Sequence, residues 1–201
     1  PNAIDAAAFA YREEIRDKMR LQLQIPQDAF VIGHVGRFGH MKNHTFLLDV
    51  FEQVNKKLPS SMLLLVGEGG LQDMIKEKAA ALGLVDKVIF TGNQADVSDY
   101  YQAMDFFVFP SVFEGLPGTV IEAQASGLRC LVSDSVTPEV LITELAQAEP
   151  LSLGAGAWAA NVLERKEYVR NQMTQAIKAA GFDVSDQVKM LEKIYLQENC
   201  Q

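Results

Sequence analysis

Short, almost purely apolar runs alternate along the chain with longer segments in which apolar residues recur every three or four positions. Unbroken Val, Ile, Leu and Phe are typical of strands that are buried on both faces of a sheet. Five runs of this kind predict strands, at Phe30–Val35, Met62–Val66, Val88–Phe90, Phe106–Phe109 and Cys130–Val132. A sixth strand is expected near Pro150–Leu153.

The segments that follow these runs have the period of a helix that is apolar on one side. They predict helices at Thr45–Lys57, Leu71–Leu82, Val97–Met104, Thr119–Ala125 and Ala157–Lys166. Strands that alternate with helices require right-handed crossovers, and these produce a mostly parallel sheet. The sequence therefore predicts an α/β fold with a sheet of about six strands that is covered on both faces.

The two ends of the chain have a different pattern. Asp5–Gln24 predicts an amphipathic helix of mixed charge, and two tail helices are expected at Glu164–Gly181 and Ser185–Gln197, together covering residues of about 164–197. The glycines of Gly154–Gly156 predict a flexible join before them. Because no repeat or low-complexity tract interrupts the chain, we expect residues 1–201 to form one domain.

Composition narrows the class of protein. A chain of 201 residues with 48% hydrophobic content is long enough to bury a real core. It begins with Pro1 rather than Met, so we expect an excised or processed piece of a longer protein. There is no recognisable signal peptide and no apolar run of the ~20 residues that span a bilayer. Cys130 and Cys200 form no disulfide framework, which fits a cytoplasmic location. The net charge of −8 argues against nucleic acid as a partner.

Glycines follow the predicted strands directly. The first three strands lead into Gly36, Gly67 and Gly92, and the fourth leads to Pro110 and then Glu114. In open α/β sheets, ligands bind in the crevice beyond the carboxyl ends of the strands. The sequence therefore predicts a ligand site at this edge of the sheet.

The most informative segment is Phe113–Glu122, in which Glu114 and Glu122 lie eight residues apart around a Gly/Pro turn. Pro117 suits the first position of the following helix because its missing N–H would be unpaired there. Gly127 is placed where a left-handed residue would end that helix. This arrangement predicts Glu114 in a loop and Glu122 about one turn into the helix.

Free amides near Gly118 and Thr119, at the start of this helix, can meet polar or anionic ligand atoms. Together with the two carboxylates they predict a cradle for a polyhydroxylated, phosphorylated ligand. The alternative is a solvated glutamate on a loop and another on an exposed helix face.

The loop after the first strand is basic. Gly36 permits an unusual turn, Arg37 offers a planar fork for phosphate, and Lys42 adds a mobile charge. The alternative is two surface cations paired with nearby acids. Because this loop shares a sheet edge with the Glu114 loop, we favour phosphate binding.

Three further features are weaker. His34, His40 and His44 lie in the basic stretch, and the i, i+4 spacing of the last two is compatible with a metal. A glutamate in the HExxH position and a nearby cysteine are both missing, so a supporting role is favoured. Val66–Gly70 resembles a fragment of a dinucleotide fingerprint but follows the second strand, which is more typical of a plain turn. Thr91–Asn93 could offer backbone groups to a nucleobase.

Four segments, in order, give the chain a family resemblance. They are Pro1-Asn2-Ala3-Ile4-Asp5, Val35-Gly36-Arg37-Phe38 with Lys42, Phe90-Thr91-Gly92, and Pro110-Ser111 through Glu114-Gly115-Leu116-Pro117 to Glu122-Ala123 and Gly127. The chain resembles the C-terminal half of the retaining glycosyltransferases of family 4, and it is similar to enzymes of bacterial capsule and exopolysaccharide assembly. This resemblance implies a Rossmann-like, doubly wound parallel sheet that is one half of a GT-B fold.

The resemblance also implies roles for individual residues. Gly36, Arg37 and Lys42 would bind the donor diphosphate, and Glu122 would accept hydrogen bonds from the ribose hydroxyls. Glu114 would be the catalytic residue and would hold the donor sugar with Gly115, Leu116 and Pro117. Gly92 and Asn93 would border the nucleobase. The family retains the configuration of the sugar and requires no metal, so we expect no cofactor.

Three departures concern the sugar side and the opening signature. Ala3 replaces a usual glycine, Arg129 stands where proline is common, and Asp134–Glu139 replaces a Gly-Gly-x-x-Glu turn. The diphosphate and carboxylate motifs remain intact. By this resemblance, we expect the acceptor domain, N-terminal in the family, to be absent from this chain.

The expected function is donor binding in a retaining glycosyltransferase that moves a sugar from a nucleotide-diphosphate sugar, with a UDP-sugar as the expected donor, to a glycan or lipid-linked acceptor in polysaccharide biosynthesis. We expect this fragment alone to be inactive. The resemblance also allows the full-length protein to associate peripherally with the inner face of the cytoplasmic membrane. One alternative is a non-catalytic nucleotide-sugar-binding module that works with a separate partner chain. Another, a sugar-nucleotide epimerase, fits the motifs less well.

Overall fold

A computed structural model describes residues 3–188 of the protein. Six strands form one sheet in the order β3-β2-β1-β4-β5-β6, and every neighbouring pair is parallel. The strands are β1 (Val31–Val35), β2 (Met62–Val66), β3 (Val88–Phe90), β4 (Phe106–Phe109), β5 (Arg129–Ser133) and β6 (Ala146–Glu149). The prediction of a parallel sheet of about six strands is confirmed.

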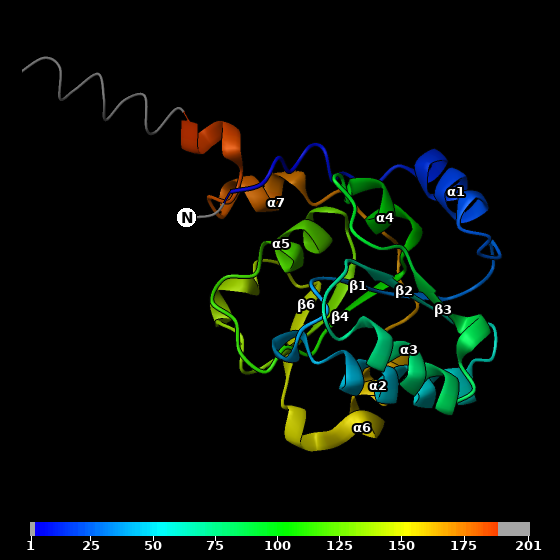
Figure 1. Ribbon diagram of the computed structural model, residues 1–201. Coiled ribbons are helices and arrows are strands. Elements are labelled where there is room, and N and C mark those ends of the chain that lie inside the picture. The colour runs from blue at the N-terminus through cyan, green and yellow to red at the C-terminus, as the bar shows by residue number, and fades with distance from the viewer. Residues whose placement is uncertain (1–2, 189–201) are drawn as a thin grey trace, which may run out of the picture.

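Helices cover both faces of this sheet (Figure 1). One face carries α1 (Glu13–Gln22), α4 (Ser98–Ala103), α5 (Gly118–Ala125) and α7 (Thr174–Ala179). The other carries α2 (His44–Lys57), α3 (Gln72–Ala81) and α6 (Gly154–Glu164). Short 3-10 turns lie at η1 (His40–Lys42), η2 (Val85–Lys87), η3 (Pro138–Val140) and η4 (Leu151–Leu153). The doubly wound α/β prediction is confirmed.

The core consists of two apolar layers separated by the sheet. Successive residues of a strand point to opposite faces, so Phe107 packs in the layer under α4 and α5 while Phe106 packs in the layer under α2 and α6. Both side chains are completely buried. This double burial is the physical reason why the central strands are apolar throughout.

The prediction of a strand near Pro150–Leu153 is wrong. Pro150 directly follows the edge strand β6 (Ala146–Glu149), and Leu151–Leu153 form the turn η4. The two central residues of β6, Gln147 and Ala148, are exposed because only β5 pairs with it. An edge strand needs no apolar run, so β6 could not be recognised from an apolar pattern in the sequence.

The predicted flexible join at Gly154–Gly156 is also wrong, because these residues form the first turn of α6. That helix is anchored by Trp158, which is fully buried and donates its indole N–H to the carbonyl of Pro150 at 3.0 Å. Tertiary packing of one large side chain therefore overrides the low helix propensity of glycine.

At the N-terminus, the helix predicted over Asp5–Gln24 is shorter than expected. Residues before α1 form turns, in which the carboxylate of Asp5 accepts the amide N–H groups of Ala7 and Ala8. Such local side-chain bonds compete with helix formation. The helix itself begins at Glu13.

The predicted helix over Glu164–Gly181 is interrupted. Irregular chain connects α6 to the short α7, and within it Arg170 donates to the carbonyls of Ser126, Gln102 and Met104. These bonds hold the segment against the C-terminal ends of α5 and α4. The predicted helix Ser185–Gln197 lies mostly outside the described residues. None of the helices within residues 3–188 has the length and apolar character needed to cross a membrane.

The chain direction across the sheet changes between β1 and β4. From β1 the chain winds outward through β2 and β3, and then returns to β4 on the other side of β1. At such a switch point the loops after the two strands diverge and leave a crevice at their carboxyl ends. The loops that carry Lys42 and Glu114 are the two loops at this position.

Candidate functional site

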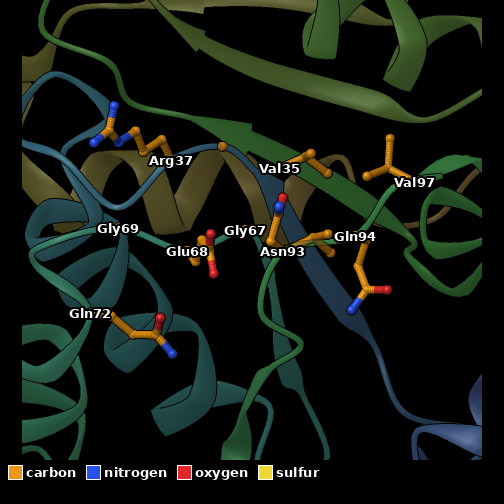
Figure 2. A pocket seen from close by; sticks show the side chains of 11 residues that line it. Val35, Arg37, Gly67, Glu68, Gly69, Gln72, Asn93, Gln94 and Val97 are labelled. Carbon is orange, nitrogen blue, oxygen red and sulfur yellow. The ribbon is translucent and has the colours of Figure 1, made fainter.

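A pocket of about 640 Å³ opens at the carboxyl ends of β1, β2 and β3. It is lined by Val35, Gly36, Arg37, Val66, Gly67, Glu68, Gly69, Gln72, Asn93, Gln94 and Val97 (Figure 2). Of the site residues predicted from sequence, Gly36, Arg37 and Asn93 line this pocket, and Gly92 directly precedes Asn93. The volume is within the range that suits a small organic ligand.

The floor of the pocket depends on two glycines that the sequence interpretation missed. Gly67 has a φ of 133°, and a Cβ there would lie 2.3 Å from the carbonyl oxygen of Gly36. Gly69 has a φ of 158°, and its Cβ would lie 2.5 Å from the oxygen of Phe38. Only glycine permits the loops after β1 and β2 to approach this closely. The signal was the pair of glycines after β2, which was interpreted as a plain turn.

Lys42 and Glu114 come together beside this pocket. The Nζ atom of Lys42 lies 2.8 Å from Oε1 of Glu114, and the two side chains are 18% and 22% exposed. The same Nζ lies 4.5 Å from the ring centre of Phe109 at the end of β4. The predicted meeting of the two loops is thus confirmed for this pair. The alternative interpretation, surface cations paired with nearby acids, is also correct for Lys42, which pairs with Glu114.

The pocket and the ion pair are continuous. Gly36 lines the pocket, and a Cβ at Gly36 would lie 3.2 Å from Cε of Lys42. Arg37 is exposed and forms no hydrogen bond or ion pair with the described residues. In Figure 2 it stands at one side of the opening, with Val97 at the other. One cation of the basic loop is therefore unpaired, and the other is shared with a carboxylate.

The turn between β4 and α5 departs slightly from the prediction. Pro117 is buried but precedes the helix, which begins at Gly118. Gly115 is exposed, whereas Leu116 packs against the apolar layer under α5. Gly127 has the left-handed φ of 72° that was expected at the helix end.

Glu122 lies about one turn into α5, as predicted, and is not simply solvated. Its Oε2 accepts a hydrogen bond of 2.8 Å from the hydroxyl of Tyr101 in α4. Burial raises the pKa of Glu122, and the bond from Tyr101 acts in the opposite direction. The exposed-helix alternative is therefore wrong for this residue.

The histidines do not form the metal site that was considered and disfavoured from their spacing. His40 is exposed in η1 while α2 begins at His44, so the two do not share a helix face. His34 and His44 are buried instead, with ring centres 4.7 Å apart. Burial lowers the pKa of His34 well below its usual value and that of His44 to about 4, so both are neutral. Within the described part of the chain, no group of three or more metal-ligating side chains occurs. Metal independence stays a prediction.

Comparisons with known proteins agree with this arrangement. Residues 15–180 match the family described as glycosyl transferases group 1. A protein of Bacillus subtilis (strain 168) that carries the name glycosyltransferase EpsF is 35% identical over 203 residues, covering 97% of this chain and 52% of that protein. The capsular polysaccharide biosynthesis glycosyltransferase CapH of Staphylococcus aureus is 29% identical over 184 residues, which cover 86% of this chain and 48% of CapH.

Among solved structures, Anabaena Alr3699/HepE in complex with UDP and glucose superposes with a TM-score of 0.81 at 23% identity. The superposition covers 96% of this chain and 55% of that protein, and at this identity it concerns the fold. The chain thus spans about half the length of the relatives that it matches. Since the family match extends over most of its length, the chain belongs to the glycosyl transferases group 1 family.

Proposed function

We propose that this chain binds the donor of a retaining glycosyltransferase that transfers a sugar from a UDP-sugar to a glycan or lipid-linked acceptor in polysaccharide biosynthesis. One observation carries the proposal. A pocket, an unpaired arginine and a lysine–glutamate pair follow one another along a single edge of the sheet. The complex of HepE with UDP and glucose supports the choice of donor, and the name of CapH supports the pathway.

In this proposal the nucleoside occupies the pocket at the ends of β1, β2 and β3. The backbone at Gly92 and the amide of Asn93 can meet the polar edge of a base. The ribose lies toward α5, where the carboxylate of Glu122 can accept from its hydroxyls. The helix α4 connects the nucleoside pocket with Glu122. Val97, just before this helix, lines the pocket, and Tyr101 within it donates a hydrogen bond to Glu122.

The diphosphate follows at the basic loop. Gly36 has no side chain, so a ligand can approach its Cα closely, whereas its N–H already donates to the carbonyl of Val66 at 2.9 Å. Arg37 and Lys42 supply two positive charges, which form strong charge-assisted bonds to phosphate oxygens. Because these cations can neutralise the diphosphate, we expect donor binding to be independent of metal.

The sugar reaches the turn at Glu114, Gly115, Leu116 and Pro117. As the diphosphate departs, positive charge develops on the sugar ring and negative charge on the leaving oxygen. A carboxylate next to the ring stabilises the positive charge, and the adjacent lysine stabilises the negative charge on the leaving oxygen. The Lys42–Glu114 pair thus has the polarity that this bond cleavage needs.

The second half of the cleft and the acceptor site belong, in this proposal, to an N-terminal domain of the full-length protein, and residues 1–201 form the donor domain. The supporting fact is the coverage of about half of each relative. Alignment of two reactants contributes roughly 7–11 kcal/mol to catalysis. We therefore propose that this chain alone binds donor without turnover. A cytoplasmic location and peripheral membrane association of the full-length protein complete the proposal.

Calorimetric titration with UDP, a panel of UDP-sugars and uridine tests this function, with and without EDTA. We expect UDP and one UDP-sugar to bind in EDTA, and Arg37→Ala to weaken both. Lys18→Ala, which removes an exposed charge from α1, is the matched control and should bind normally. Failure of every nucleotide to bind, or binding only with Mg²⁺, contradicts the proposal. Donor binding without turnover in the full-length protein would instead favour a non-catalytic module.

A further inference from the structure

Tyr101 of α4 is an immobile side chain next to the candidate site. It is completely buried, and its ring centre lies 5.7 Å from that of Phe9 and 5.8 Å from that of Phe107. Its backbone is held as well, because Nη2 of Arg170 donates to its carbonyl oxygen at 2.9 Å. A side chain packed on all sides in this way presents its hydroxyl in one fixed direction.

That hydroxyl points at Glu122. It lies 2.8 Å from Oε2 of Glu122 and 3.1 Å from the carbonyl oxygen of Thr119. A phenol has one hydrogen to donate. The carboxylate is the closer acceptor and carries charge, so it forms the stronger bond.

The bond leaves the other carboxylate oxygen available. No other side-chain hydrogen bond to Glu122 occurs within residues 3–188, and Oε1 lies 3.9 Å from the point where a Cβ of Gly118 would be. The Oε1 atom therefore lies next to the backbone of Gly118, which has no side chain to cover it. Half of the carboxylate is fixed by the protein, and half faces the start of α5.

The same bond favours the charged form of Glu122. Burial raises the pKa of this carboxyl group, and the hydrogen bond from Tyr101 is what opposes the rise. A protonated carboxyl group would lose part of its capacity to accept hydrogen bonds from ribose. Tyr101 thus affects both the orientation and the charge of Glu122.

We infer that Tyr101 is a positioning residue that presents one oxygen of Glu122 to the ribose hydroxyls of the donor. This inference rests on the proposed ribose-binding role of Glu122. It assigns to α4, which the carboxylate motif does not include, a part in selecting a ribonucleotide. Without the hydroxyl, the carboxylate can rotate and is protonated at a higher pH.

The test compares UDP with 2′,3′-dideoxyuridine diphosphate, which lacks both ribose hydroxyls, by calorimetry at pH 6 and pH 8. Tyr101→Phe removes one buried oxygen and should weaken UDP roughly three- to tenfold. The loss should be larger at pH 6, because protonation of Glu122 is then easier. Binding of the dideoxy compound should not change.

Two variants make the outcome specific. Tyr100→Phe removes the same atom from the neighbouring residue, whose hydroxyl has no hydrogen bond within the described chain, and should bind both ligands normally. Glu122→Gln should abolish the preference for UDP. If it does not, the proposed ribose contact is wrong. If Glu122→Gln abolishes the preference but Tyr101→Phe keeps it, or weakens both ligands equally, the inference about Tyr101 is overturned.

Discussion

Glu114 and Glu122 stand eight residues apart in one turn-and-helix segment, but the protein holds them in opposite ways. Glu114 pairs with a cation from a neighbouring loop, and both partners are partly exposed. Glu122 accepts from a neutral hydroxyl that is buried in the layer under α4 and α5. The first contact joins two surface loops at the switch point of the sheet, whereas the second joins two helices on one face.

The difference supports the two separate roles proposed for these carboxylates. An ion pair between loops can be rearranged when a diphosphate offers Lys42 a second anion, because both side chains are partly solvated. A carboxylate held from the core cannot be rearranged so easily. In the proposed function Glu114 therefore acts at the reacting end of the donor, where charge changes, and Glu122 acts at the end that is only bound.

The largest expected effect is on turnover. In the full-length protein, Glu114→Gln should lower the rate of transfer by about 10²- to 10³-fold, because no carboxylate then stabilises the positive charge that develops on the sugar ring as the diphosphate departs. UDP affinity should stay within about threefold of wild type, since the diphosphate contact with Lys42 remains. Initial rates and calorimetry measure the two quantities. Equal losses of UDP binding and turnover would contradict the division between the two carboxylates.

Glu122→Gln should have the opposite signature. A carboxylate that accepts two ribose hydroxyls contributes on the order of 1.5–3 kcal/mol, so UDP and UDP-sugar should weaken alike by roughly ten- to a hundredfold. The control is Glu13→Gln, which changes an exposed glutamate of α1. A loss confined to the UDP-sugar would place Glu122 at the sugar instead.

The sheet and the general position of the site could be predicted from sequence because local pattern encodes them. Double burial leaves the central strands purely apolar, and crossovers bring their carboxyl ends to one edge. The meeting of Lys42 with Glu114 follows from that topology. The edge strand at Ala146–Glu149 has no such pattern, since one neighbour and an exposed face place few demands on its residues.

The partner of Glu122 could not be predicted, because Tyr101 lies on another helix and looks like an ordinary apolar residue of an amphipathic pattern. The same holds for Gly67 and Gly69, whose need for glycine arises from the approach of the loop at Gly36 and Phe38. These contacts depend on three-dimensional packing between segments distant in sequence. Motif spacing identifies the groups that carry charge but not the neighbours that orient them.

Substitution of Lys42, the cation that pairs with Glu114, should have a smaller effect on UDP binding. Lys42→Ala should weaken UDP about tenfold and leave uridine unchanged, because the lysine forms its charge-assisted bond with phosphate, which uridine lacks. The effect is limited because Lys42 already interacts with Glu114 in the unbound protein. Added salt should reduce the difference between wild type and variant, since the charge of Lys42 is partly exposed and is therefore screened. Lys18→Ala is again the control. Equal weakening of uridine and UDP would mean that the loop is structural.

The smallest effect concerns stability and tests whether Lys42 is free to change partners. A double-mutant cycle of Lys42→Ala and Glu114→Gln in urea unfolding should give a coupling energy of about 1 kcal/mol or less, because both side chains keep contact with water. The Glu52–Lys56 pair of α2, also 2.8 Å apart but with its lysine 59% exposed, is the matched control and should couple by about 0.3–0.5 kcal/mol. A Lys42–Glu114 coupling of several kcal/mol would show a rigid structural bridge. Lys42 could not then leave Glu114 for a diphosphate without a large loss of stability. Glu114 would in that case be held as firmly as Glu122.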